Sequence, residues 1–253
     1  MILQIADISS LVAQKIIVDS LSQYGFAIIR HNINQTLIDK VYTEWSIFFD
    51  SDEKKYFSFD NETQDGYVSQ DQSETAQGAN EKDLKEFYHF HTWGQHPNHT
   101  KISSMLLFDE LFNLSNLIMS WISEKEILCR NASILRPIYY PASIKSIRAS
   151  EHTDINMLTL LLATEEKGLQ MLIDDEWVDA PLDQSLMIIN SGDMLNSFGN
   201  FPSGIHRVVG SHKSRISLPF FAHAFDGFKI SDLMTAKMFK EQRLVEIGLK
   251  QEL

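Results

Sequence analysis

The chain of 253 residues carries 22 lysines and arginines against 34 aspartates and glutamates, which gives a formal net charge of −12. Its 43% of hydrophobic residues is typical of a globular protein with a buried core and excludes wholesale disorder. The single cysteine, Cys129, excludes an internal disulfide framework and a cysteine-rich zinc site. The acidic balance disfavours nucleic acid and anionic membranes as main partners, because both attract clustered lysine and arginine.

The first residues lack the basic segment, long apolar run and small-residue cleavage site of a secretion signal. No stretch approaches the roughly 18 uninterrupted apolar residues that a membrane-spanning helix needs. We therefore expect a cytoplasmic protein without membrane partners, and the sequence leaves its oligomeric state open.

The first half of the chain is predicted to be mainly helical. Apolar residues recur at helical spacing over 9–23 and again after Asn34, a residue type that often caps a helix N-terminus. A short apolar strand is predicted over 26–29, between these two helices. Residues 103–128 carry the pattern of a longer helix.

From residue 134 onward, short segments rich in β-branched and aromatic residues alternate with turn residues. They predict eight strands, at 134–139, 145–151, 157–163, 169–173, 176–178, 186–190, 206–209 and 215–222. Such strands at this spacing predict a double-sheet jelly roll or a barrel, with the helices packed against one sheet. The expected fold is α+β in a single domain over 1–253, made of a mainly helical region 1–130, a jelly-roll core 131–225 and a C-terminal helix over 226–253.

A histidine and a carboxylate lie two residues apart in His152-Thr153-Asp154, at the end of a predicted strand. Side chains at i and i+2 of a strand share a face, so both can reach one ion. His206 begins another predicted strand, and two histidines with one carboxylate match the facial triad of non-haem Fe(II) oxygenases. A structural zinc site would usually have a fourth protein ligand, and no cysteine is placed to supply it. Asp193 is predicted to be a turn or cap residue.

Arg215 and Ser217 share a face of the strand that follows His206. A guanidinium beside a hydroxyl is suited to bidentate binding of a carboxylate. An arginine that points into a small barrel is costly unless it meets an anion. Two hypotheses stay open here: a carboxylate ligand, or an internal salt bridge to a buried acidic residue.

Together these motifs resemble the isopenicillin-N-synthase-like branch of the Fe(II)/2-oxoglutarate-dependent dioxygenases. The resemblance is strongest in the order and separation of three segments: His152-Thr153-Asp154, His206-Arg207-Val208 and Arg215-Ile216-Ser217. It spans nearly the whole chain through further segments, which are Gly25-Phe26, Phe48-Phe49, Glu53-Lys54, Gly66-Tyr67, Asp83-Leu84-Lys85-Glu86, Tyr139-Tyr140-Pro141 and Gly192-Asp193.

The resemblance implies a double-stranded β-helix with flanking N-terminal helices. It implies an oxidoreductase that hydroxylates or desaturates a small organic substrate, with O₂ as oxidant. It also implies Fe(II) bound by His152, Asp154 and His206, and it makes ascorbate a further candidate cofactor.

The resemblance further implies 2-oxoglutarate as cosubstrate, with its C5 carboxylate held by Arg215 and Ser217 and with Tyr140 as another contact. Ile138 stands where the family often has asparagine, so one hydrogen bond to the cosubstrate is missing from the pattern. Some members use a similar Arg/Ser pair for a substrate carboxylate instead, so an iron oxidase that does not need 2-oxoglutarate is an alternative. A metal-binding jelly-roll sensor without turnover is a second alternative.

Three residues are candidates for contact with the prime substrate. Arg148 would share a face with the iron ligands if its strand were regular, whereas a β-bulge would turn it away. Tyr67 lies in the polar segment 60–82, which is either a lid over the pocket or a tolerated surface insertion. His89 forms a second same-face pair with His91, which is either a substrate or metal site or an ordinary polar strand edge.

Overall fold

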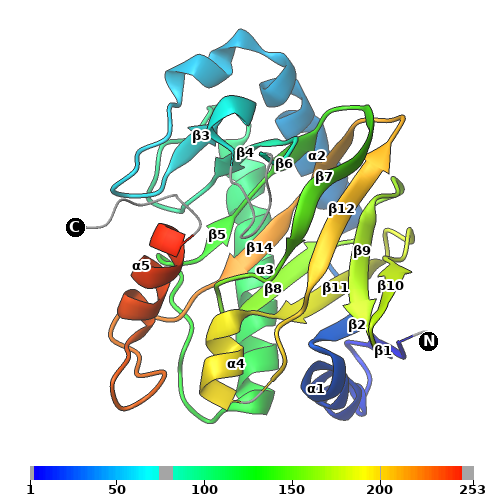
Figure 1. The fold of residues 1–253 in the computed structure, drawn as a ribbon, viewed down its shortest axis with the longest axis vertical. Helices are drawn as coiled ribbons and strands as arrows, with labels where there is room; N and C mark the ends of the chain where they lie inside the picture. The colour runs from blue at the N-terminus through cyan, green and yellow to red at the C-terminus, as the bar shows by residue number, and fades with distance from the viewer. Residues whose placement is uncertain (1–2, 74–81, 200, 247–253) are drawn as a thin grey trace.

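A computed structural model describes residues 3–73, 82–199 and 201–246, in which helices lie around several edges of a β-rich core (Figure 1). The elements, in chain order, are β1 (Ile5–Asp7), α1 (Ala13–Tyr24), β2 (Phe26–Arg30), α2 (Gln35–Asp50), the 3₁₀ helix η1 (Asp52–Tyr56), β3 (Gly66–Val68), the 3₁₀ helix η2 (Gln70–Gln72), β4 (Glu86–His89), α3 (Lys101–Ile122), β5 (Ile134–Leu135), β6 (Ile138–Tyr140), β7 (Ser143–His152), β8 (Leu158–Leu162), β9 (Leu169–Ile173), β10 (Glu176–Asp179), β11 (Leu186–Ser191), α4 (Asp193–Gly199), β12 (His206–Ser211), β13 (Arg215–Ser217), β14 (Pro219–Ala222) and α5 (Ala236–Glu246). None of the described helices is long and apolar enough to cross a membrane.

The strands form a six-stranded sheet in the order β1-β2-β11-β8-β14-β5 and two four-stranded sheets, β10-β9-β12-β7 and β13-β6-β4-β3. Among the described strands, all pairs are antiparallel except β1 with β2. Neighbouring strands come from distant parts of the chain, since β12 lies between β9 and β7 while β8 lies between β11 and β14. This interleaving is that of a jelly roll, and it confirms the predicted α+β class with a double-stranded β-helix core.

The central strands of the six-stranded sheet are buried on both faces. On β8, Leu160 and Leu162 pack into the core beneath the helices, whereas Leu161 packs into the core between the sheets. On β11, Ile189 packs into the core beneath the helices and Ile188 packs into the core between the sheets. This double burial explains why the sequences of these strands are continuous apolar runs rather than alternating patterns.

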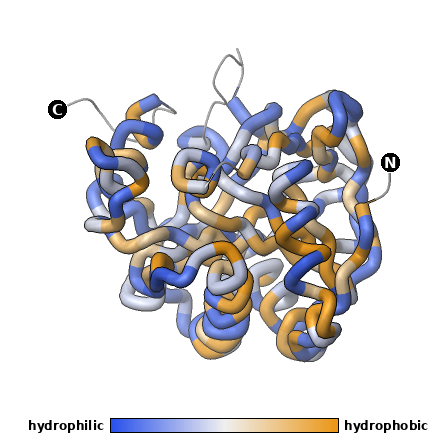
Figure 2. Tube along the Cα trace, turned by 90° about the horizontal axis from the view of Figure 1, so that it is seen from below, coloured by the Kyte–Doolittle hydropathy of each residue, from blue (hydrophilic) through white to orange (hydrophobic). Residues whose placement is uncertain are grey.

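Helices α1 and α3 contact the six-stranded sheet, and α2 packs against α3. The helices at the edge of the molecule show both hydrophilic and hydrophobic colours along their turns (Figure 2), as expected for helices that bury one face. Asn34 caps α2 as predicted, because its side chain accepts a hydrogen bond from the Thr36 N–H at 2.8 Å. Gly25 ends α1 with φ 72°, and a Cβ there would lie 2.5 Å from the Pro202 carbonyl oxygen.

Several element boundaries differ from the sequence prediction. The run 134–139 is two strands, β5 and β6, because Pro137 has no N–H to continue a ladder. The strand β1 and the short helix α4 were not predicted, and each has at most seven residues. The polar segment 60–82 contains β3 and η2 but lies partly outside the described residues, as does the end of the predicted C-terminal helix.

Candidate active site

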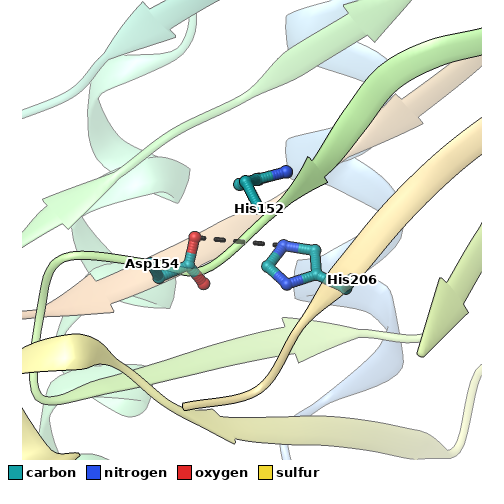
Figure 3. A group of neighbouring side chains, drawn as sticks. All are labelled: His152, Asp154 and His206. Carbon is teal, nitrogen blue, oxygen red and sulfur yellow. Dashed lines mark ion pairs between the residues drawn. The ribbon is translucent and has the colours of Figure 1, made fainter. Parts of the chain in front are cut away.

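The two histidines of the predicted triad face each other across a strand pair. His152 ends β7 and His206 begins β12, and the antiparallel register sets them directly opposite. Their ring centroids are 4.3 Å apart, and Asp154 joins them from the turn that follows β7 (Figure 3). His206 Nε2 is 3.9 Å from Asp154 Oδ1, and one donor atom from each of the three side chains lies within 4.8 Å of the others.

Both imidazoles are oriented by the chain just before them. The Nδ1 of His152 is 2.7 Å from the Ser150 carbonyl oxygen, and the Nδ1 of His206 is 3.0 Å from the Gly204 carbonyl oxygen. Each carbonyl accepts a hydrogen bond from an Nδ1–H, which leaves the Nε2 lone pair available to a metal. Burial, with the His206 imidazole adding to it, lowers the pKa of His152 to about 4, so this ring is in its neutral, ligating form at neutral pH.

The carboxylate of Asp154 is also held in a fixed orientation. Its Oδ2 accepts hydrogen bonds from Thr159 Oγ1 at 2.7 Å and from Asn190 Nδ2 at 2.8 Å, which leaves Oδ1 toward the histidines. Burial alone would raise the pKa of Asp154, but the neighbouring His206 and His152 and these two hydrogen bonds lower it below its usual value. The carboxylate is therefore ionised and directed at the same point as the two Nε2 atoms.

This donor set fits a ferrous ion. Two imidazoles and one carboxylate converge from one side, and every other polar atom of the three groups described above is already hydrogen-bonded. Such outer partners are what hold ligands in place around a metal. Two histidines and a carboxylate on one face are typical of non-haem iron sites that keep open positions.

The predicted cosubstrate residues lie in the same cavity as the triad. The cavity has a volume of about 660 Å³, and its lining includes the triad together with Arg215, Ser217 and Tyr140. Arg215 and Ser217 come from β13, and Arg215 pairs in register with Tyr140 of β6. The volume is in the range of sites that bind small ligands.

Arg215 is a buried cation without a buried acidic partner. It is 5% exposed, its Nε donates to Thr164 Oγ1 at 3.3 Å, and its guanidinium carbon lies 5.8 Å from the Tyr140 ring centroid. Within the described ranges, no carboxylate lies within 4.0 Å of it. Burial lowers the pKa of Arg215, and Tyr140 and Tyr42 partly offset this. Of the two hypotheses left open by the sequence, the geometry favours an arginine that awaits an anionic ligand.

Arg148 lies away from the cavity. The register between β7 and β12 shifts within the pair, so side chains counted by twos from the iron ligands do not stay on one face. Arg148 is fully buried, and its Nη2 donates to the carbonyl oxygens of Ser211 and Lys213. It therefore ties β7 to the turn after β12, and a substrate role finds no support in the structure.

The other two substrate candidates differ in position. The Tyr67 hydroxyl hydrogen-bonds to the Glu86 carboxylate, and Tyr67 does not contribute to the described lining of the cavity. His89 lines the cavity, and its Nδ1 is 2.8 Å from the Gln64 carbonyl oxygen. His91 lines it too, but in the described part of the chain no third donor joins this pair to make a metal site.

The hydrogen-bond partners of Asp154, which are Thr159 and Asn190, were not predicted from the sequence. Asp193, in contrast, has the structural role that the sequence predicts. Thr159 and Asn190 are polar residues inside otherwise apolar strands, and that interruption is the signal that could have revealed them. Asp193 begins α4, where its Oδ2 accepts from Thr153 Oγ1 at 3.0 Å and lies 2.9 Å from Arg243 Nη2. It therefore anchors α5 beside the ligand turn.

The fold and the triad define a class of enzyme, and comparison with known proteins gives the same class. Residues 131–224 match the family described as the 2OG-Fe(II) oxygenase superfamily, and residues 4–107 match the N-terminal family described as non-haem dioxygenase in morphine synthesis. The chain belongs to the 2OG-Fe(II) oxygenase superfamily, a family of oxidoreductases. This confirms the resemblance drawn from the motifs.

Three relatives illustrate the match. A crystal structure of a candidate oxygenase from Shewanella oneidensis superposes with a TM-score of 0.84 at 32% identity, covering 98% of this chain and 100% of that one. Deacetoxyvindoline 4-hydroxylase from Catharanthus roseus is 27% identical over 213 residues, which are 75% of this chain and 53% of that enzyme. Isopenicillin N synthase from Amycolatopsis lactamdurans is 40% identical over 76 residues, which are 29% of this chain and 23% of the synthase. The match thus spans about half or less of these two curated relatives.

Proposed function

We propose that the protein is an oxygenase that uses Fe(II), O₂ and 2-oxoglutarate to hydroxylate or desaturate a small organic substrate. One observation carries the proposal: a single cavity joins an oriented His-Asp-His triad to a buried arginine that has no acidic partner among the described residues. The family supports the cofactors, and the name of the hydroxylase relative supports the reaction type.

In this proposal His152, Asp154 and His206 hold the metal. Bound there, ferrous iron supplies the oxidising chemistry, with the balance 2-oxoglutarate + O₂ + RH giving succinate + CO₂ + ROH for a hydroxylation. The protein contributes geometry: hydrogen bonds to the Nδ1 atoms and to Asp154 Oδ2 keep each ligand atom aimed at one point.

Arg215 and Ser217 orient the cosubstrate through its distal carboxylate. The Nε of Arg215 is engaged by Thr164, so its two Nη groups are the donors available to the ligand. Tyr140 lies beside this guanidinium and contributes a further contact. A bidentate pair at this depth fixes the direction from which the keto acid end approaches the triad.

An iron oxidase that does not need 2-oxoglutarate is the second candidate. It is favoured by the local identity to isopenicillin N synthase and by Ile138 in the place where the family often has asparagine. A cytoplasmic location, the absence of nucleic-acid and membrane partners, and a benefit from ascorbate stay predictions of the sequence, as does the single-domain boundary 1–253.

The test is 2-oxoglutarate turnover in air. We expect the ferrous protein to convert 2-oxoglutarate slowly into succinate even without a prime substrate. The Asp154→Ala variant should lose both this turnover and its iron, whereas Asp19→Ala, which removes an exposed carboxylate on α1, should behave like the wild type. Iron-loaded protein that forms no succinate, or an Asp154→Ala variant that keeps its activity, would contradict the proposal.

A further inference from the structure

An ion pair between Asp83 and Lys85 lines the cavity beside the triad, apart from the residues assigned to the metal and the cosubstrate. The two side chains are each 4% exposed, and Lys85 Nζ donates to Asp83 Oδ2 at 2.9 Å. Both residues lie just before β4, and we call them the Asp83–Lys85 pair. The inference below rests on the metal ligands of the proposed function.

The burial of this pair is weak evidence for a role in stability. Removing two charges from water is costly, and their mutual attraction often returns no more than that cost. Apolar residues of similar volume would stabilise the fold at least as well. The second carboxylate oxygen of Asp83 indicates a different role, because Oδ1 accepts a hydrogen bond from the Ser150 N–H at 3.0 Å.

Ser150 connects this carboxylate to an iron ligand. Its carbonyl oxygen lies 2.7 Å from the Nδ1 of His152 and accepts the hydrogen bond that orients that ring. The next residue after Asp83 binds the same strand, since the Leu84 N–H donates to the Arg148 carbonyl oxygen at 2.8 Å. Segment 83–84 is therefore attached to β7 at two points, both within four residues of the ligand.

The two orienting carbonyls are supported in different ways. The one that orients the other imidazole belongs to Gly204, whose N–H donates to the Ser191 carbonyl oxygen of the buried strand β11 at 2.9 Å. Ser150 lies on β7, which among the described strands is at the edge of its sheet and pairs with β12 alone. Segment 83–84 covers that edge. The orientation of His152 thus depends on a side chain from a distant part of the chain.

We propose that Asp83 is a positioning residue of the metal site, which fixes the Ser150 backbone and through it the direction of the His152 imidazole. Lys85 neutralises the carboxylate and holds its Oδ2, so that Oδ1 stays toward Ser150. Asp83 acts through His152 and does not itself bind the metal. The rival role for two cavity-lining residues is contact with the prime substrate, and that role would leave metal affinity unchanged.

The first test measures Fe(II) affinity by anaerobic competition with a chelator in two double variants. Asp83→Ala/Lys85→Met and Asp83→Asn/Lys85→Met both lack the ion pair, but the asparagine keeps an oxygen that can accept from the Ser150 N–H. We expect the alanine variant to bind Fe(II) about tenfold more weakly and the asparagine variant to stay within about twofold of the wild type. Equal affinities of the two variants, whether lowered or not, would overturn the proposal.

The second test uses the Co(II)-substituted protein and its proton NMR spectrum. The Nδ1–H groups of His152 and His206 should each give an exchangeable, paramagnetically shifted resonance, and each is protected by its carbonyl acceptor. In Asp83→Ala/Lys85→Met only one of these protons should exchange faster with solvent, because the Gly204 carbonyl keeps its own support. Faster exchange of both, which a general loosening of the fold would give, or of neither, would overturn the proposal.

The matched control is Lys54→Met/Glu86→Ala, which removes the neighbouring ion pair, at 3.0 Å, from residues outside the described lining of the cavity. It should bind Fe(II) like the wild type, and an equal loss there would contradict a specific role of Asp83. The outcomes also separate the two levels of inference. If Asp154→Ala loses iron but the Asp83 variants do not, the positioning role alone fails. If iron affinity depends on Asp83 but no succinate forms, the proposed function fails and the positioning role stands.

Discussion

Replacing Arg215 by leucine should separate cosubstrate binding from iron binding. Because Nε is engaged by Thr164, the ligand carboxylate can accept two charge-assisted hydrogen bonds from the Nη groups. Such bonds contribute about 1.5 kcal/mol or more each, so the variant should lose about 3 kcal/mol. This corresponds to a loss of roughly two orders of magnitude in the apparent affinity for 2-oxoglutarate. Iron content should stay the same, since Arg215 is not among the residues that orient the triad.

The stability of the variant gives a second, independent readout. Arg215 is 5% exposed and has no acidic partner among the described residues, so its burial without a ligand is unfavourable. Without 2-oxoglutarate, Arg215→Leu should therefore unfold at the same temperature as the wild type or a higher one. Adding 2-oxoglutarate should raise the melting temperature of the wild type but barely that of the variant.

The assay is succinate formation as a function of 2-oxoglutarate concentration, with iron content measured on the same samples. The control is Arg207→Leu, which removes an arginine next to His206 whose guanidinium carbon lies 3.9 Å from the Trp177 ring centroid, outside the cavity wall. Equal losses of iron and of 2-oxoglutarate affinity, or the same shift in Arg207→Leu, would refute the reasoning and make Arg215 a structural residue.

Three further predictions address the metal ligands, the buried histidines and a turn. Asn190→Ala should lower iron affinity about 10- to 100-fold in competition with a chelator, because the ligand carboxylate loses an orienting bond; unchanged affinity would contradict this. The folded-state pKa of His223 is about 3, below the ordinary 6.5, so the unfolded chain binds one more proton than the folded chain between these two pH values. The free energy of unfolding should therefore fall as the pH drops below about 6.5, by up to about 1.4 kcal/mol per pH unit. His223→Gln should flatten that slope in urea titrations and the exposed His212→Gln should not, so equal slopes would argue against it. Gly25→Ala should destabilise the fold by about 1–3 kcal/mol, owing to its positive φ and the close Pro202 carbonyl oxygen, and an unchanged urea midpoint would count against that view.

The triad was predictable because its determinants are local. Side chains two residues apart on a strand share a face, so His152 and Asp154 could be predicted to reach one ion. The residues that follow His206 in the sequence were enough to place it at the start of a strand. The antiparallel register between β7 and β12 then places the two histidines opposite each other. The strands were predictable for a similar reason, as each is a short apolar run between turn residues.

The features that escaped prediction depend on long-range geometry. A β-bulge cannot be seen in a single strand, so the side on which Arg148 lies could not be fixed from spacing. The guanidinium carbon of Arg136 lies 4.7 Å from the Phe87 ring centroid and 4.8 Å from the Phe221 ring centroid, although these two rings are far apart in the chain and meet only in the fold. Thr159 resembles any polar residue in a strand until its bond to the ligand carboxylate is seen.

The most direct test of the central claim is the visible absorption of the protein with Fe(II) and 2-oxoglutarate under anaerobic conditions. We predict a weak charge-transfer band, formed only when both are present, which is absent in Asp154→Ala and requires far more 2-oxoglutarate in Arg215→Leu. Protein that retains iron at His152, Asp154 and His206 but gives no band at any 2-oxoglutarate concentration would contradict the account and favour an oxidase that binds its own substrate at Arg215.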